Sequence, residues 1–130
     1  MPKTVDELLA EARATLERVT VQQAHDELAG GALLVDVRTS EQRIEHGEIP
    51  GAIPIGLNVL EWRLDPSSEW RIPPATDHGV RVIVFCQEGY SSSLAAARLQ
   101  SLGLHRATDV IGGFEAWIDA GLPVDGGERP

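Results

Sequence analysis

The chain has 130 residues, with 11 Lys and Arg against 20 Asp and Glu, a formal net charge of -9. This length fits one domain, and such an acidic balance argues against nucleic acid or anionic membranes as partners, because both need clustered Lys and Arg. One cysteine excludes an internal disulfide framework. The N-terminus is charged throughout and no apolar run is long enough for a membrane span, so we expect a cytoplasmic protein.

Residues 1–18 have the pattern of an amphipathic helix. Thr4 is suited to the N-cap position, and apolar residues recur at three- and four-residue steps, namely Val5, Leu8, Leu9, Ala12, Leu16 and Val19. This apolar face either covers the chain's own domain, which is the commoner case, or binds a protein partner.

The remainder of the chain alternates between extended and helical patterns. We expect strands at 19–21, 32–37, 52–55, 80–85 and 108–113, and helices at 22–29, 40–46, 58–64, 91–102 and 114–120. A proline-containing surface loop fills 65–79. This alternation predicts an α/β fold with a mainly parallel sheet, followed by a short tail at 125–130.

Cys86 stands where the strongest strand pattern stops, in "VIVFCQEGYSSSLAAARL". Ligands of open parallel sheets bind beyond the carboxyl ends of the strands, and the next helix directs its free N–H groups to the same place. Gly89 permits a positive φ in the connecting loop. Lowering a thiol pKa from about 8.5 to about 6.5 requires about 2.7 kcal/mol, and a helix terminus supplies up to about 2 kcal/mol of it. The pattern predicts a thiolate held by main-chain N–H groups; the alternative is an inert, buried cysteine.

Three segments resemble the rhodanese-like domain family: "CQEGYSSSLAAARL", "LLVDVRTSEQRIEHGEIPGAIPI" and "VIGGFEAWIDAGLPV". The resemblance covers 19–124. It implies a five-stranded parallel sheet with helices on both faces. It also implies a thiolate that takes sulfane sulfur from a small donor, such as thiosulfate, and passes it as a persulfide to a thiol or cyanide acceptor. No cofactor and no metal are expected.

The same resemblance assigns residues to the site. Cys86 carries over as the sulfur carrier, and the backbone that follows it carries over as the anion cradle, namely Gln87, Glu88, Gly89, Tyr90, Ser91 and Ser92. Tyr90 is either a wall of the pocket or an exposed loop tip. We expect the three serines at 91–93 to cap the following helix, and the three tryptophans to pack in or near the core.

The loop departs from the family pattern in its charges. Many family members have arginine directly after the cysteine or five positions after it, where this chain has Gln87 and Ser91. Glu88 adds a negative charge, and we expect it to point outward. Arg38 and Arg63 are candidate replacements for the missing cation. Arg38 alternatively pairs with Asp36 or another carboxylate, and Arg63 alternatively lies on a solvated helix face.

Asp36 is expected to tie loops together by hydrogen bonds rather than to act on substrate. Other functions stay open on the same scaffold. A phosphatase of the related fold wants an arginine six positions after the cysteine, where this chain has Ser92. Arsenate reduction is a similar alternative. A non-catalytic binding or redox-sensing module is the alternative from a different class.

Overall fold

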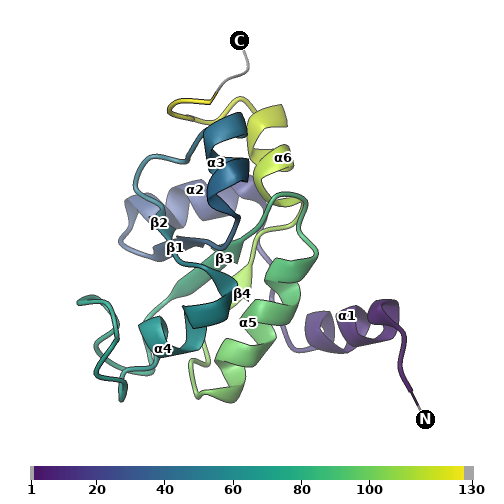
Figure 1. The fold of residues 1–130 in the computed structure, drawn as a ribbon, viewed down its shortest axis with the longest axis vertical. Helices are drawn as coiled ribbons and strands as arrows, with labels where there is room; N and C mark the ends of the chain where they lie inside the picture. Colours follow the sequence, from purple (N-terminus) through teal and green to yellow (C-terminus); the bar gives the residue numbers. More distant parts are fainter. Residues whose placement is uncertain (1, 128–130) are drawn as a thin grey trace.

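A computed structural model describes residues 2–127. Its helices and strands follow one another in the expected alternation (Figure 1). In chain order they are α1 (Val5–Ala14), α2 (Val21–Ala29), β1 (Leu33–Asp36), α3 (Ser40–His46), β2 (Ile53–Pro54), the 3-10 helix η1 (Leu57–Val59), α4 (Leu60–Leu64), β3 (Val82–Phe85), α5 (Ser91–Ser101), β4 (Thr108–Asp109) and α6 (Gly113–Asp119).

The strands form one parallel sheet in the order β2-β1-β3-β4. The prediction of five strands is therefore wrong by one. Val19 makes only a single parallel bridge with Val110 at the edge of the sheet. The chain cannot extend this bridge into a strand, because Thr20 is already the N-cap of α2 and its hydroxyl accepts from the N–H of Gln23.

The strand side chains alternate between two apolar cores, one on each face of the sheet. Leu34, Ile83 and Phe85 pack with residues of α2 and α6, including Ala24, Phe114 and Trp117. Val35, Val82 and Val84 pack with residues of α4 and α5, including Leu60, Leu64, Ala96 and Leu99. The predicted α/β fold with helices on both faces is thus confirmed.

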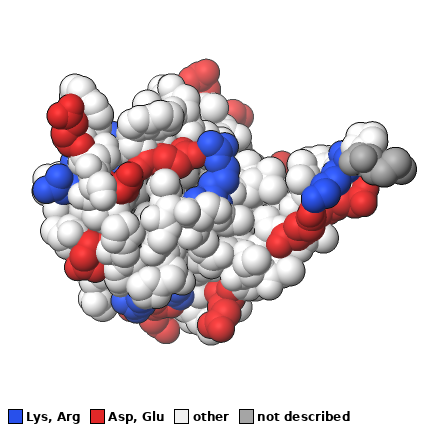
Figure 2. All heavy atoms as spheres, turned by 90° about the horizontal axis from the view of Figure 1, so that it is seen from below, with Lys and Arg blue, Asp and Glu red and all other residues white. Residues whose placement is uncertain are grey.

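The helix α1 begins with the predicted Thr4 cap, which forms a reciprocal capping box with Glu7. Its C-terminal part packs on α5, with Ala12 and the following Leu16 buried. Its N-terminal part projects from the body of the molecule, and Val5 is 67% exposed (Figures 1 and 2). On the face shown in Figure 2, acidic and basic side chains are interspersed along this helix. The helix therefore covers its own domain only over its second half.

Several local expectations are wrong. The N-cap of α5 is Tyr90, without a side-chain cap, and not one of the serines at 91–93. Trp62 and Trp70 are 58% and 64% exposed, because they belong to the outer side of the short α4 and to the loop after it. Only Trp117 is a core residue, at 1% exposure.

No helix in residues 2–127 is long and apolar enough to cross a membrane. Of the predicted tail at 125–130, Asp125 exchanges two backbone hydrogen bonds of 2.8 Å with Glu48. Residues 128–130, like Met1 of the predicted N-terminal helix, lie outside the described part of the chain.

Candidate active site

Cys86 lies directly after β3, and its side chain faces the loop that leads into α5. Its Sγ accepts hydrogen bonds from the backbone N–H groups of Gly89 at 3.2 Å and Ser92 at 3.4 Å. Gly89 has a φ of +91°, a conformation that L side chains rarely adopt. The turn at Gly89 folds the loop back over the sulfur, as the sequence predicted.

Opposing effects act on the Cys86 thiol. Burial raises its pKa, while hydrogen bonds from the Ser92 and Ser91 hydroxyls and from the backbone N–H groups of Ser92 and Gly89 lower it; the net pKa lies below the ordinary value. The Ser92 hydroxyl also donates to Asp109 at 2.8 Å. A hydroxyl has one hydrogen, so it serves only one of these acceptors at a time. We therefore regard the two backbone N–H groups as the permanent donors to the sulfur.

Cys86 is 7% exposed and borders a hollow of about 340 Å³, large enough for a small anion. Glu88 is exposed, but it also lines this hollow, so the expectation that it points away from the site is not met; Tyr90 lines the hollow too while staying 61% exposed. The other lining residues are Val37, Arg38, Thr39, Gln42, Leu57, Gln87 and Ser91. Within residues 2–127, the N–H groups of Gln87, Glu88, Tyr90 and Ser91 have no acceptor, so this loop retains donors for a ligand.

The first residues of α6 support the loop from behind. The N–H of Phe114 donates to the Cys86 carbonyl at 2.9 Å, and the N–H of Glu115 donates to the Gln87 carbonyl at 3.0 Å. Gly113 has a φ of +58° and lies in direct backbone contact with the loop. Sequence reasoning did not assign this role to α6, although the Gly112-Gly113 pair in one of the quoted motifs was its signal.

Arg38 lies beneath the loop with no exposed side-chain area. Its Nε and Nη2 donate to the carboxylate of Asp36 at 2.9–3.2 Å, and Nη2 also donates to the Gly47 carbonyl at 2.8 Å. Nη1 donates to Gln87 Oε1 at 3.2 Å, and the guanidinium lies 3.9 Å from the centroid of the Phe114 ring. The alternative expectation, an ion pair with Asp36, is what the geometry shows. Asp36 also accepts from the Arg38 N–H at 2.9 Å, so it holds the turn after β1, and it is the Arg38 side chain that links this turn to Gly47 and Gln87.

Arg63 is not brought to the sulfur. It does not line the hollow at Cys86, and its Nη1 donates to the carbonyl of Trp70 at 2.7 Å. Arg63 therefore fastens the loop after α4 and is not placed to replace a cation of the active-site loop.

The expected capping role of the serines is wrong, because no side chain caps α5 and two of the three hydroxyls bind a buried acid. Ser92 and Ser93 each donate to Asp109 Oδ2 at 2.8 Å. Asp109 has no exposed side-chain area and pairs with Arg18, whose Nε lies 2.8 Å from Oδ1. A carboxylate without contact to water needs such donors. Sequence reasoning missed Asp109 and Arg18, since no local pattern links positions so far apart.

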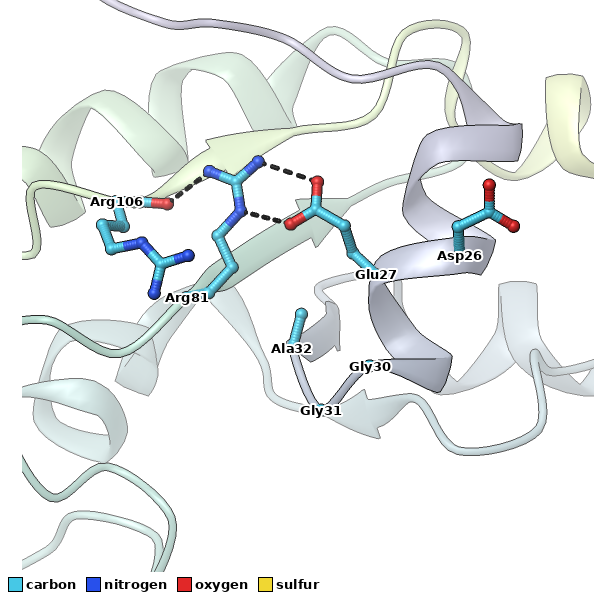
Figure 3. A pocket seen from close by; sticks show the side chains of 7 residues that line it. All are labelled: Asp26, Glu27, Gly30, Gly31, Ala32, Arg81 and Arg106. Atoms are coloured by element: carbon cyan, nitrogen blue, oxygen red, sulfur yellow. Dashed lines mark hydrogen bonds and ion pairs between the residues drawn. The ribbon is translucent and has the colours of Figure 1, made fainter.

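A separate hollow of about 470 Å³ lies at the opposite, amino-terminal end of the strands (Figure 3). Arg81 spans it and binds both carboxylate oxygens of Glu27, at 2.8 and 3.0 Å, and donates to the Arg106 carbonyl. The hydrogen bond from Arg81 lowers the pKa of Glu27 against the opposing effect of burial. Arg81 and Glu27 therefore neutralise each other, and this hollow contains a surface ion pair.

Fold and site together define an α/β protein with a cysteine whose sulfur accepts main-chain N–H groups at the end of a parallel strand. The model of the rhodanese-like domain matches residues 20–120, and the chain belongs to this family.

Known proteins resemble the chain over most of its length. A thiosulfate sulfurtransferase GlpE of Haemophilus influenzae (strain PittEE) is 31% identical over 111 residues, covering 85% of this chain and 96% of the relative. A Rhodopseudomonas palustris protein of unknown function, described as a possible tyrosine phosphatase, has a similar structure (TM-score 0.84, 32% identity, 96% and 99% coverage). The human single-domain sulfurtransferase TSTD1 superposes with a TM-score of 0.64 at 28% identity, covering 78% of this chain and 95% of that one.

Proposed function

We propose that this protein is a sulfurtransferase that carries sulfane sulfur on Cys86. The observation that supports this most directly is the position of Sγ, which accepts two backbone N–H groups and borders an open hollow. The names of the Haemophilus and human relatives favour the same activity.

The proposed reaction has two balanced steps. The Cys86 thiolate attacks the outer sulfur of thiosulfate, an Sγ–S bond forms, the S–S bond of the donor breaks, and sulfite leaves with the electron pair. In the second step a thiolate or cyanide attacks the terminal sulfur of the persulfide, and the Cys86 thiolate leaves. No external oxidant is needed, because each step transfers the sulfur as a sulfane sulfur atom with no net gain or loss of electrons.

The loop suits both charged states of the carrier. A thiolate and a persulfide are each anions, and main-chain N–H groups arranged around one point stabilise either. Four N–H groups of the loop have no acceptor, so they can donate hydrogen bonds to the anion that supplies the sulfur and to the sulfur atom added to Cys86. Within the described chain there is no second cysteine, so the acceptor has to come from outside.

The test is a donor screen read by intact mass. The protein is incubated with thiosulfate, mercaptopyruvate or a small persulfide, and we expect it to gain the mass of one sulfur atom. The Cys86→Ser variant keeps the size of the side chain and should gain nothing, and cyanide should remove the added sulfur as thiocyanate. A protein that forms no adduct with any of the donors would instead support a binding module.

Phosphatase activity is a second candidate, favoured by the description of the Rhodopseudomonas structure. That chemistry needs a guanidinium on the transferring phosphoryl oxygens. The position six residues after Cys86 is Ser92, which is fully buried and bonded to Asp109. We therefore expect no hydrolysis of p-nitrophenyl phosphate above that of Cys86→Ser, measured in the same preparation that gains sulfur.

A further inference from the structure

Two arginines outside the family-matched region hold the back of the active-site loop. Arg13 on α1 donates through Nη2 to the carbonyl of Gly89 at 2.7 Å. Arg18, in the segment after α1, donates to the same oxygen at 3.1 Å. Both precede residue 20, where the match to the family begins.

The geometry of a peptide unit relates these contacts to the hollow. The described peptide bonds include no cis bond, and in a trans peptide the C=O and the following N–H point in opposite directions. The N–H that shares a peptide unit with the Gly89 carbonyl is that of Tyr90. Holding the carbonyl toward the arginines directs the Tyr90 N–H away from them. That N–H has no acceptor among residues 2–127, and Tyr90 lines the hollow at Cys86.

The two arginines differ in net charge. Arg18 is neutralised by the buried Asp109, just as Arg38 is neutralised by Asp36. Arg13 has no carboxylate partner among the described residues; its Nε donates to Ser93 Oγ at 3.1 Å, and its guanidinium lies 5.8 Å from the centroid of the Tyr90 ring. Arg13 therefore brings an unneutralised positive charge into contact with this loop.

We propose that Arg13 is a positioning residue of the cradle, which aims and polarises the Tyr90 N–H through the Gly89 carbonyl and so replaces the loop arginine that positions 87 and 91 lack. A charged donor on a carbonyl strengthens the N–H at the other end of the same peptide unit, because linked hydrogen bonds polarise one another. For binding of an anionic sulfur donor, this inference rests on the proposed function. The effect of Arg13 on the ionisation of the Cys86 thiol does not depend on that function.

The test compares Arg13→Gln with Lys3→Gln in the full chain. Both remove one positive charge, but Lys3 lies just before α1 and pairs with Glu11, away from the loop. For Arg13→Gln we expect alkylation of Cys86 well below its pKa to be about three- to tenfold slower, a rise of about half to one pKa unit. We expect the KM for thiosulfate to rise by a similar factor, with a smaller change in kcat. Lys3→Gln should match the wild type in both.

Rescue separates positioning from folding. Arg13→Lys keeps the charge but loses the planar fork, so it should recover part of the lost reactivity. The thermal unfolding midpoint of each variant identifies a loss of fold. Arg13→Gln with the alkylation profile of Lys3→Gln would overturn the inference. If the wild type gains no sulfur, the proposed function fails, but the alkylation profiles still decide the role of Arg13.

Discussion

The carbonyl oxygen of Cys86 lies against Gly113 so closely that a Cβ atom at Gly113 would be 2.4 Å from it. The same Cβ would be 2.8 Å from the backbone nitrogen of Gly89. The second glycine of the Gly112-Gly113 pair therefore allows the start of α6 to contact the loop and to place the N–H of Phe114 on the Cys86 carbonyl. The packing of the Cys86 loop therefore depends on the absence of a side chain at Gly113, which is distant from the loop in the sequence.

The variant Gly113→Ala should lose both stability and thiol reactivity. The methyl group meets backbone atoms, which cannot move aside alone, and the residue has a φ of +58°. A left-handed conformation costs an L residue about 1–2 kcal/mol, and we expect the clash to bring the total loss to about 2–4 kcal/mol. Urea unfolding measures the stability, and the rate of Cys86 alkylation measures the cradle.

Gly121→Ala is the matched control for this change. Gly121 has a φ of +73°, but a Cβ there would have no atom within 4 Å. It should lose only the conformational part, about 1–2 kcal/mol, and keep the wild-type alkylation rate. Equal losses in the two variants would show that the contact with the Cys86 loop is not what makes Gly113 necessary.

The parts of the site that were predictable are local in sequence. A fully buried strand that ends directly before Cys86, a glycine three residues after the cysteine and a helix start together predict a sulfur facing backbone N–H groups. These features depend on residues close to one another in the sequence, so the hydrophobic pattern and the local backbone geometry determine them. The exposure of Glu88 follows in the same way, whereas its place on the wall of the hollow does not.

The parts that were not predictable depend on long-range contacts. Ser92 and Ser93 have the residue type of helix caps, but a buried Asp109 from β4 takes their hydroxyls. A buried carboxylate without hydrogen-bond donors costs more free energy than a helix N-terminus without a side-chain cap, because water can bind the free N–H groups of the helix. In the same way, the fifth strand is shortened to one bridge because the N-cap of α2 follows directly.

Ser92→Ala should raise the pKa of Cys86. The fold lowers this pKa, partly through the Ser92 hydroxyl, so the thiolate persists at pH values where a free thiol is protonated. Ser93 and Arg18 also donate to Asp109, so the Ser92 hydroxyl can turn to the thiolate without leaving that carboxylate unpaired. Without this hydroxyl, the thiolate should disappear at a higher pH. Alkylation rate against pH, with urea-unfolded protein as reference, measures the shift.

Ser93→Ala is the control for this titration. It loses the same type of bond to Asp109, about 1 kcal/mol of stability, but its hydroxyl does not lower the pKa of the thiol. The two variants should therefore be similarly destabilised, with the larger displacement of the alkylation profile in Ser92→Ala, because Ser93→Ala reaches the thiol only through the bond that its hydroxyl accepts from Arg13. Identical profiles would mean that the Ser92 hydroxyl stays on Asp109 and that the backbone N–H groups alone stabilise the thiolate.

Arg38→Lys should be a stability defect and not a substrate-binding defect. An ammonium cannot reproduce the planar fork on Asp36 and its bond to Gly47, and a buried carboxylate that loses its partner costs about 3–5 kcal/mol. Lysine keeps one charge near Asp36, so we expect a loss of about 2–4 kcal/mol in urea unfolding. Arg63→Lys, with one bond to a surface loop, should lose less than about 1 kcal/mol. If Arg38→Lys were as stable as the wild type but had a raised KM for thiosulfate, Arg38 would be a substrate ligand after all.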